Sequence, residues 1–418
     1  MKRQSFIATG AAALAATPRF ALAAGPGATI KIGFLESFSG VFSDLGAYHK
    51  AGAMLALDDA NRKGRVKYEF VMGDDGSKPP IATTEARRLV SQEGVDVLFG
   101  GVSSANGLAL GPLALDLGVF VMLIGPQDSS ITGAKAAKLT YRFGPGLRMM
   151  LQPLFRRVLA LGKKWYFIQA DYAFGKDGYS LLSAALKHAG GTEVGLDVVK
   201  LGTTDFSSVL TKVRNSDTDV LLLANSGLDA ANTAKQFVDF GLNKRMKLAG
   251  LSLEDIYYNA LPLDAIAGAT FPVLWTPSVS PSAAKLAARM RRDIKGPISS
   301  RHYLGYMALT TLIERMNAVG TTRADKLAEA FDKHSFEAAK ANKAEWHGCD
   351  HQCAQDVYAG AVVTSKQFAK TENMFEIVAE VPAAESDGTC DSPWAKDAQA
   401  NFATQKIATR ENYTPKTF

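Results

Sequence analysis

The sequence predicts an α/β protein with two parallel β-sheets, each covered by helices on both faces. Short apolar segments alternate with helical segments from Ile30 to about residue 275. The expected strands, such as Val95–Phe99 and Val119–Ile124, are almost continuously apolar, which is typical of parallel strands buried on both faces. A chain of 418 residues is also long for a single hydrophobic core, so we expect two domains.

The first sheet is predicted from strand–helix alternations near the N-terminus. Gly64 follows the first helical segment, and Pro79-Pro80 begin the second, as helix ends and starts often do. Right-handed crossovers would join these strands into one parallel sheet. The expected strands are 30–35, 66–72, 95–99 and 119–124, and the expected helices are 47–62, 81–93 and 104–117.

The same pattern repeats after a short extended piece at 139–143. The expected strands are 164–169, 193–200, 219–223 and 246–249, with helices at 147–161, 205–213 and 228–240 and another that ends at His188. Two later helices, 282–294 and 302–318, are expected to pack back on the first sheet, and 357–363 and 375–381 have strand-like patterns.

These patterns divide the chain into a leader and two lobes. Residues 1–23 form the leader, residues 28–143 and 276–345 the N-terminal lobe, and residues 144–275 and 346–418 the C-terminal lobe with its tail. Two α/β lobes joined by several crossings have the geometry of a hinged clamp that closes on a ligand.

The leader has the features of a secretory signal peptide. Lys2 and Arg3 form a charged start, Phe6–Ala16 is an apolar run, and Ala21-Leu22-Ala23 is a cleavage site. The apolar run is too short to span a membrane, and no later run is long enough. The start resembles a twin-arginine signal with Lys in place of the first Arg, so both export routes stay open.

The charge distribution does not indicate a nucleic-acid-binding protein. Removing the leader takes away Lys2, Arg3 and Arg19 and no acid, which lowers the net charge from +6 to +3. The basic residues form no block longer than the pairs Arg156-Arg157 and Arg291-Arg292, and no aromatic residues alternate with them.

Two polar loops follow the strands of the first sheet. Ser103 and Ser104 lie at the start of one helix, and Gly125–Ser130 follow the next strand. Both loops would lie at the carboxyl ends of the strands, where open α/β folds bind ligands. A helix N-terminus offers N–H donors that suit a carboxylate, although the same residues could serve only as caps and turns.

The sequence offers little for catalysis or for cofactor binding. It contains no G-x-S-x-G, H-E-x-x-H or Walker lysine motif, and no G-x-G-x-x-G spacing. A secreted hydrolase would need a nucleophile paired with a base, and His188 and His351 are the histidines to test for that role. We therefore expect no enzyme activity and no cofactor.

A group of cysteines and histidines near residue 350 allows a metal site or a disulfide. In a strand, His347, Cys349, His351 and Cys353 would face one side, as zinc ligands can. An exported chain favours disulfides instead. In a strand, Cys349 and Cys353 would lie about 13 Å apart, too far for a bridge, so one of them would pair with Cys390. If the segment turns, Cys349 and Cys353 could pair with each other.

Several motifs, in their order and spacing, resemble the type I solute-binding proteins of ABC importers, and more narrowly the leucine/isoleucine/valine-binding-protein family. They are Ile32–Leu35 with Ser39-Gly40 and Gly46, Asp59–Asn61, Gly100–Ser104 and Asp171–Gly175. The resemblance implies two Rossmann-like lobes with parallel sheets, joined by a three-crossing hinge. It also implies a ligand held between the lobes and delivery to a membrane permease in the periplasm.

The resemblance assigns roles to residues of the first lobe. Ser103 and Ser104 match the serines that hold a ligand carboxylate. Gln127 and Asp128 match the loop opposite, and they depart from the small residues usual there. Phe42 lies where the family often has an aromatic side chain that covers the ligand.

The second lobe is assigned in the same way. Tyr172 and Phe174 would line the cleft, and Asn225 and Ser226 match the next loop. Glu254 lies near the acid that pairs with the ammonium of an amino acid, but a shift of one residue would put Asp255 there.

The resemblance also includes a cysteine in the motif Cys349–Gln352 and a later one near the C-terminus, which favours a Cys349–Cys390 disulfide over a metal site. It implies a ligand that is a small carboxylate, either an apolar or aromatic amino acid or an aromatic acid. The expected partners are the permease subunits, and the expected state is a monomer. The alternative is a sensor that binds amides or other small solutes and presents its closed form to a signalling partner.

Overall fold

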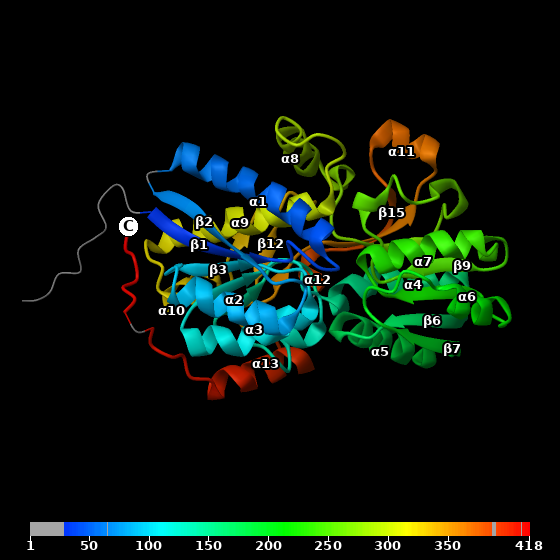
Figure 1. Ribbon diagram of the computed structural model, residues 1–418, viewed down its shortest axis with the longest axis horizontal. Helices are drawn as coiled ribbons and strands as arrows, with labels where there is room; N and C mark the ends of the chain where they lie inside the picture. Colours follow the sequence, from blue (N-terminus) through cyan, green and yellow to red (C-terminus); the bar gives the residue numbers. More distant parts are fainter. Residues whose placement is uncertain (1–28, 65, 387–389, 411) are drawn as a thin grey trace, which may run out of the picture.

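The computed structural model of the protein describes residues 29–64, 66–386, 390–410 and 412–418. The predicted signal peptide, residues 1–23, lies outside the described residues. The chain forms two α/β lobes that lie side by side along the long axis of the molecule (Figure 1). None of the helices in the described ranges is both long and apolar enough to cross a membrane.

The first lobe contains a five-stranded parallel sheet in the order β2-β1-β3-β4-β5. Its strands are β1 (Thr29–Glu36), β2 (Lys67–Asp74), β3 (Val97–Gly100), β4 (Phe120–Leu123) and β5 (Thr140–Arg142). Its helices are α1 (Ser43–Lys63), α2 (Pro79–Ser91), α3 (Ser104–Leu117), the short η1 (Ser129–Thr132), α8 (Pro281–Met290), α9 (Ser300–Val319) and α10 (Ala324–Phe331). The strands are buried, as their continuous apolar sequence predicts.

Helices α1 and α9 of this lobe pack at backbone distance. A Cβ atom on Gly52 would lie 2.0 Å from the carbonyl oxygen of His302, and one on Gly305 would lie 2.1 Å from that of His49. Only glycine fits at these two crossing points. The close approach brings the side chains of His49 and Arg301 together below the space between the lobes.

The second lobe contains a seven-stranded sheet in the order β15-β14-β10-β9-β8-β6-β7. Its strands are β6 (Lys164–Ala170), β7 (Thr192–Val199), β8 (Val220–Ala224), β9 (Lys247–Gly250), β10 (Thr270–Val273), β14 (Val357–Val362) and β15 (Phe375–Val381). Its helices are α4 (Leu147–Leu161), α5 (Ala173–His188), α6 (Ser207–Arg214), α7 (Gly227–Asp239) and α11 (Ser365–Thr371), with short turns at η2 (Leu242–Lys244), η3 (Asp255–Tyr257) and η4 (Leu263–Ala265).

This second sheet is not wholly parallel, which differs from the sequence prediction. Strands β6 to β10 are parallel, but β14 is antiparallel to both β10 and β15. The reason is the route of the chain. Strand β10 runs toward the first lobe, where α8 follows it after the turn η5 (Pro277–Val279), whereas β14 enters from the first lobe and therefore runs the other way.

The lobe boundaries near the C-terminus also differ from the sequence prediction, which placed 346–418 with the second lobe. The chain passes to the second lobe after β5, back after β10, and out again only after a small antiparallel sheet made of β11 (Ser335–Phe336), β12 (Ala344–Trp346) and β13 (Cys353–Ala354). Trp346 and Cys353 are buried in the core of the first lobe, so the third crossing comes after residue 354.

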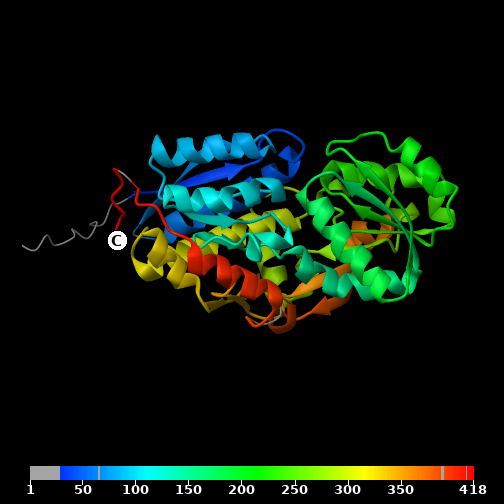
Figure 2. The ribbon, with the colours of Figure 1, turned by 90° about the horizontal axis from the view of Figure 1, so that it is seen from below.

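The C-terminal segment returns to the first lobe after β15 and the short α12 (Ala383–Ser386). Helix α13 (Pro393–Thr404) lies against η1, and Figure 2 shows this red segment running along the first lobe. The backbone N–H of Ala408 donates to the Leu115 carbonyl, and Lys416 forms a 2.6 Å ion pair with Asp96. These bonds hold the tail on the first lobe.

Candidate ligand-binding site

A small pocket lies where the two lobes face each other. Its cavity volume is about 20 Å³, room for about one water molecule. The first lobe supplies Phe42, Leu45, Val102, Ser104, Gly125, Gln127 and Arg301, and the second supplies Tyr172, Phe174 and Ser226. Six of the ten predicted ligand-binding residues line it: Phe42, Ser104, Gln127, Tyr172, Phe174 and Ser226.

The sheet topology explains why these residues meet. Ser104 follows β3, Gln127 follows β4, Tyr172 follows β6 and Ser226 follows β8. Each therefore lies at the carboxyl end of a parallel strand, and the carboxyl ends of the two sheets face each other.

Ser104 organises the loop on the first-lobe side of the pocket. Its hydroxyl oxygen accepts hydrogen bonds from the backbone N–H groups of Gln127 and Asp128, both at 3.1 Å. Because Ser104 also lines the pocket, its hydroxyl can in addition donate a hydrogen bond to a ligand there. Ser103 has a different role, because its Oγ caps α3 by accepting from the N–H of Asn106 at 3.4 Å. Ser103 is not among the residues that line the pocket.

The buried Arg142 holds the loop that contains Gln127 through several hydrogen bonds. Its guanidinium donates to the Asp128 carbonyl at 2.5 Å, to the Thr132 hydroxyl at 2.7 Å and to the Gln352 side chain at 2.6 Å. The Asp128 carboxylate accepts from the N–H and hydroxyl of Ser130 and so caps η1. Asp128 therefore shapes the loop but does not line the pocket.

Three aromatic rings form the apolar side of the pocket, and they come from both lobes. The Phe42 and Tyr172 ring centroids are 6.0 Å apart, and those of Tyr172 and Phe174 are 5.9 Å apart. The Tyr172 hydroxyl lies 2.6 Å from the Ser226 Oγ. Burial raises the pKa of the Tyr172 phenol, so it stays protonated at neutral pH. The neighbouring Asn225 instead donates to the Thr233 hydroxyl and does not line the pocket.

Glu254, the predicted partner of a ligand ammonium, is paired with a residue that the sequence analysis did not identify. Its carboxylate accepts from Arg301 through Nε at 2.9 Å and also through Nη2, and it accepts from the Ser252 hydroxyl at 2.7 Å. Arg301 is only 3 % exposed and Glu254 only 4 %. Burial alone would raise the pKa of Glu254, but the guanidinium holds that pKa below its usual range.

Arg301 is also the centre of a buried polar chain that joins the lobes. Its Nη1 lies 3.5 Å from the His49 Nε2, and the His49 Nδ1 lies 2.9 Å from the Glu36 carboxylate. Glu36 and His49 are fully buried. Arg301 gave no signal in the sequence, because it lies at the start of an ordinary helix 47 residues from the acid that it contacts.

Asp255 makes a second contact between the lobes. Its carboxylate accepts from the Ser300 N–H and the Ser299 hydroxyl, each at 2.8 Å, at the N-terminus of α9. Burial raises the pKa of Asp255 to about 6, although these hydrogen bonds oppose the shift. Of the adjacent acids, Glu254 therefore lies beside the pocket-lining Arg301, while Asp255 points to the start of a first-lobe helix.

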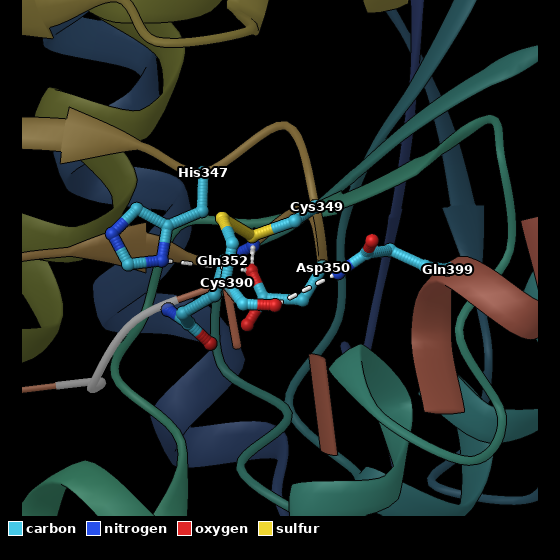
Figure 3. Close-up of a disulfide and its surroundings, with 6 residues drawn as sticks. All are labelled: His347, Cys349, Asp350, Gln352, Cys390 and Gln399. Atoms are coloured by element: carbon cyan, nitrogen blue, oxygen red, sulfur yellow. Dashed lines mark hydrogen bonds and ion pairs between the residues drawn. A yellow bond between two sulfur atoms is a disulfide. The ribbon is translucent and has the colours of Figure 1, made fainter. Parts of the chain in front are cut away.

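Of the cysteines and histidines near residue 350, Cys349 forms a disulfide. Cys349 is bonded to Cys390, with 5.7 Å between their Cα atoms, and Figure 3 shows His347 and Asp350 beside the bridge. The donor atoms of His347, Cys349 and Asp350 lie within 4.8 Å of one another, but the Cys349 sulfur is committed to the disulfide.

His351 does not join that group. Its ring stacks between those of Tyr141 and Phe402, at centroid distances of 3.9 and 4.3 Å. Burial lowers its pKa to about 3, so the ring stays neutral. His188 lies at the exposed end of α5, so neither histidine reaches the pocket.

Comparison with known proteins agrees with this fold. Residues 29–367 match a family described as periplasmic binding protein. A Leu/Ile/Val-binding protein homologue of Brucella melitensis is 25 % identical over 316 residues, which cover 74 % of this chain and 84 % of the relative. BraC3, a Leu/Ile/Val-binding protein of Rhizobium johnstonii, is 26 % identical over 58 % of this chain and 67 % of its own.

Solved structures show the same architecture. A periplasmic binding protein from Burkholderia mallei superposes with a TM-score of 0.81 at 27 % identity, covering 88 % of this chain and 98 % of its own. A solute-binding protein from Rhodopseudomonas palustris, bound to 3,4-dihydroxybenzoic acid, superposes with a TM-score of 0.77 at 20 % identity, covering 86 % and 99 % of the two chains. At 20 % identity, the similarity to the Rhodopseudomonas palustris protein shows only that the two chains share a fold.

Proposed function

This chain belongs to the periplasmic binding protein family, and from that premise we propose that it is the solute receptor of an ABC importer for a small carboxylate. In this proposal residues 1–23 direct export to the periplasm, and the mature protein captures its ligand between the lobes. One chain supplies both walls of the pocket, so binding needs no second copy, and we propose a monomer.

The observation that carries the proposal is the chemistry of the pocket lining. The Ser104 hydroxyl, the N-terminus of α3 and the Arg301 guanidinium offer hydrogen bonds and positive charge to a carboxylate. The rings of Phe42, Tyr172 and Phe174 offer an apolar surface to the rest of the ligand. The cavity of about 20 Å³ is too small for such a ligand as it stands, so in this proposal the lobes separate to admit the ligand.

Closure follows from the fact that both lobes line the pocket. A ligand bound to the Ser104 loop would contact Tyr172 and Ser226 only when the lobes come together, so its binding free energy favours the closed form. The closed form then presents a defined surface to the permease. The relatives named as a Leu/Ile/Val-binding protein and a homologue of one, and the fold neighbour seen with an aromatic acid, support this ligand class.

Thermal unfolding with a panel of aromatic acids, branched-chain acids and amino acids tests the proposal. A ligand at about one hundred times its Kd should stabilise the protein by about 2.7 kcal/mol.

In Gln127→Ala the loop keeps its backbone bonds but loses a pocket-lining side chain, and we expect about a tenfold loss of affinity. Gln92→Ala, on the exposed end of α2, is the matched control and should bind normally. Absence of stabilisation by every carboxylate would contradict the proposal.

A further inference from the structure

The pocket contains a cation but no acid. Arg301 lines it, and none of the other described residues that line it is acidic. Glu254 lines an adjoining space that shares Gln127, and it receives two hydrogen bonds from Arg301 and one from Ser252. Its charge is therefore paired with the guanidinium before a ligand arrives.

Other carboxylates around the space between the lobes also have partners. Asp255 accepts from Ser299 and Ser300, and Asp229 accepts from the Gly202 N–H. Glu36 contacts His49, Asp44 accepts from Tyr257 at 2.5 Å, and Asp177 accepts from the Ser129 N–H at 2.8 Å. Asp128 caps η1.

Arg301 still has hydrogen-bonding capacity toward the pocket. A guanidinium carries five N–H donors, and Glu254 takes up one on Nε and one on Nη2. The 3.5 Å contact to His49 uses at most one of those on Nη1. Because Arg301 lines the pocket, its remaining donors are the charged groups that a ligand anion could engage there.

We propose that Arg301 determines the specificity of this receptor: it neutralises Glu254, binds the ligand carboxylate, and so selects acids that lack an ammonium group. This inference rests on the proposed function and narrows its ligand class. An α-amino acid would bring its ammonium into a closed pocket beside a guanidinium, where no acidic residue lines the pocket and the Glu254 charge is already paired with Arg301. Burying a charge without a partner is costly, whereas the deaminated acid of the same shape avoids that cost.

Calorimetry with matched ligand pairs tests the selectivity. Phenylalanine is compared with phenylpropionate, and leucine with isocaproate, on the full mature chain. Where either member of a pair binds, we expect the deaminated acid to bind at least roughly thirtyfold more tightly than the amino acid. Equal or tighter binding of the amino acid would overturn this inference while leaving the proposed function intact. If no acid of either kind binds, the proposed function itself fails.

A double variant separates the two roles of Arg301. Arg301→Gln alone would leave Glu254 buried without its counter-ion, so it is combined with Glu254→Gln. The double variant has two neutral glutamine side chains in place of the ion pair. We expect the double variant to lose about tenfold or more in affinity for the acid. The matched control is Arg88→Gln with Glu93→Gln, a surface ion pair far from the pocket, and it should bind normally. Unchanged affinity in the folded Arg301 and Glu254 double variant would overturn the inference.

Discussion

At the scale of single residues, neighbours in the chain have different roles in the pocket. Ser103 and Ser104 are equally good candidates in the sequence, yet only Ser104 lines the pocket, because successive residues at a helix start point in different directions. Asp128 and Asn225 likewise hold η1 and α7 rather than the ligand site. Ser103 and Asp128 thus serve as helix caps, which was the alternative role of these polar residues.

The two serines should therefore differ in their effect on ligand binding. Ser103→Ala removes a helix cap and should cost about 1 kcal/mol in the free energy of unfolding, with unchanged affinity. Ser104→Ala removes a pocket donor and leaves the N–H groups of Gln127 and Asp128 without their acceptor, so affinity should fall about tenfold. Urea unfolding and calorimetry measure the two quantities. Equal loss of affinity in both variants would contradict the assignment.

At the scale of elements, α13 links the C-terminal segment to the binding loop. It lies against η1, which directly follows Asp128. Trp394 of α13 packs under the Arg148 guanidinium at 4.2 Å, and Arg148 donates to the Ser129 carbonyl at 3.2 Å. The Cys349–Cys390 disulfide anchors this helix close to its start.

Removing the disulfide should loosen this arrangement. In Cys349→Ser with Cys390→Ser, the free energy of unfolding should fall by roughly 2–5 kcal/mol, as is usual when a native bridge is lost. Denaturant unfolding of the variant and of the oxidised parent protein measures the difference, and the parent after reduction should match the variant. Identical stability of oxidised and reduced parent protein would show that the bridge does not restrain the fold.

At the scale of the whole molecule, the proposed closure would bury ionisable groups between the lobes. Asp255 lies against the N-terminus of α9, and burial raises its pKa to about 6 in this structure, which we take as the closed form. When the lobes separate and the carboxylate meets water, its pKa should return toward its ordinary value of about 4. The closed form then binds more protons than the open form.

Ligand affinity should therefore fall as the pH rises through the range from about 4 to about 6. Above this range the closed form must hold an ionised, buried Asp255, so affinity should be several-fold lower at pH 7.5 than at pH 5. Calorimetry at the two pH values, with a ligand that is ionised at both, measures the effect. Asp255→Asn should remove most of the pH dependence. Affinity that rises with pH in the parent protein would contradict this account.

Local sequence was enough to determine the α/β class, the two lobes and most strands. The alternation of apolar strands with helices is a local pattern, and Gly or Pro at the element ends is a local signal. The same order of elements put Ser104, Gln127, Tyr172 and Ser226 at the carboxyl ends of parallel strands. The helix α13 was missed, although Ser392-Pro393 before an alanine-rich segment is a recognisable start.

Only the tertiary structure decided which polar groups remain for a ligand. Whether Glu254 is available depends on Arg301, and the return of the tail to the first lobe depends on bonds such as the one between Lys416 and Asp96. These partners are separated by 47 and 320 residues in the chain. Local sequence determines which elements form, but the partner of a buried charge is set by where distant elements pack.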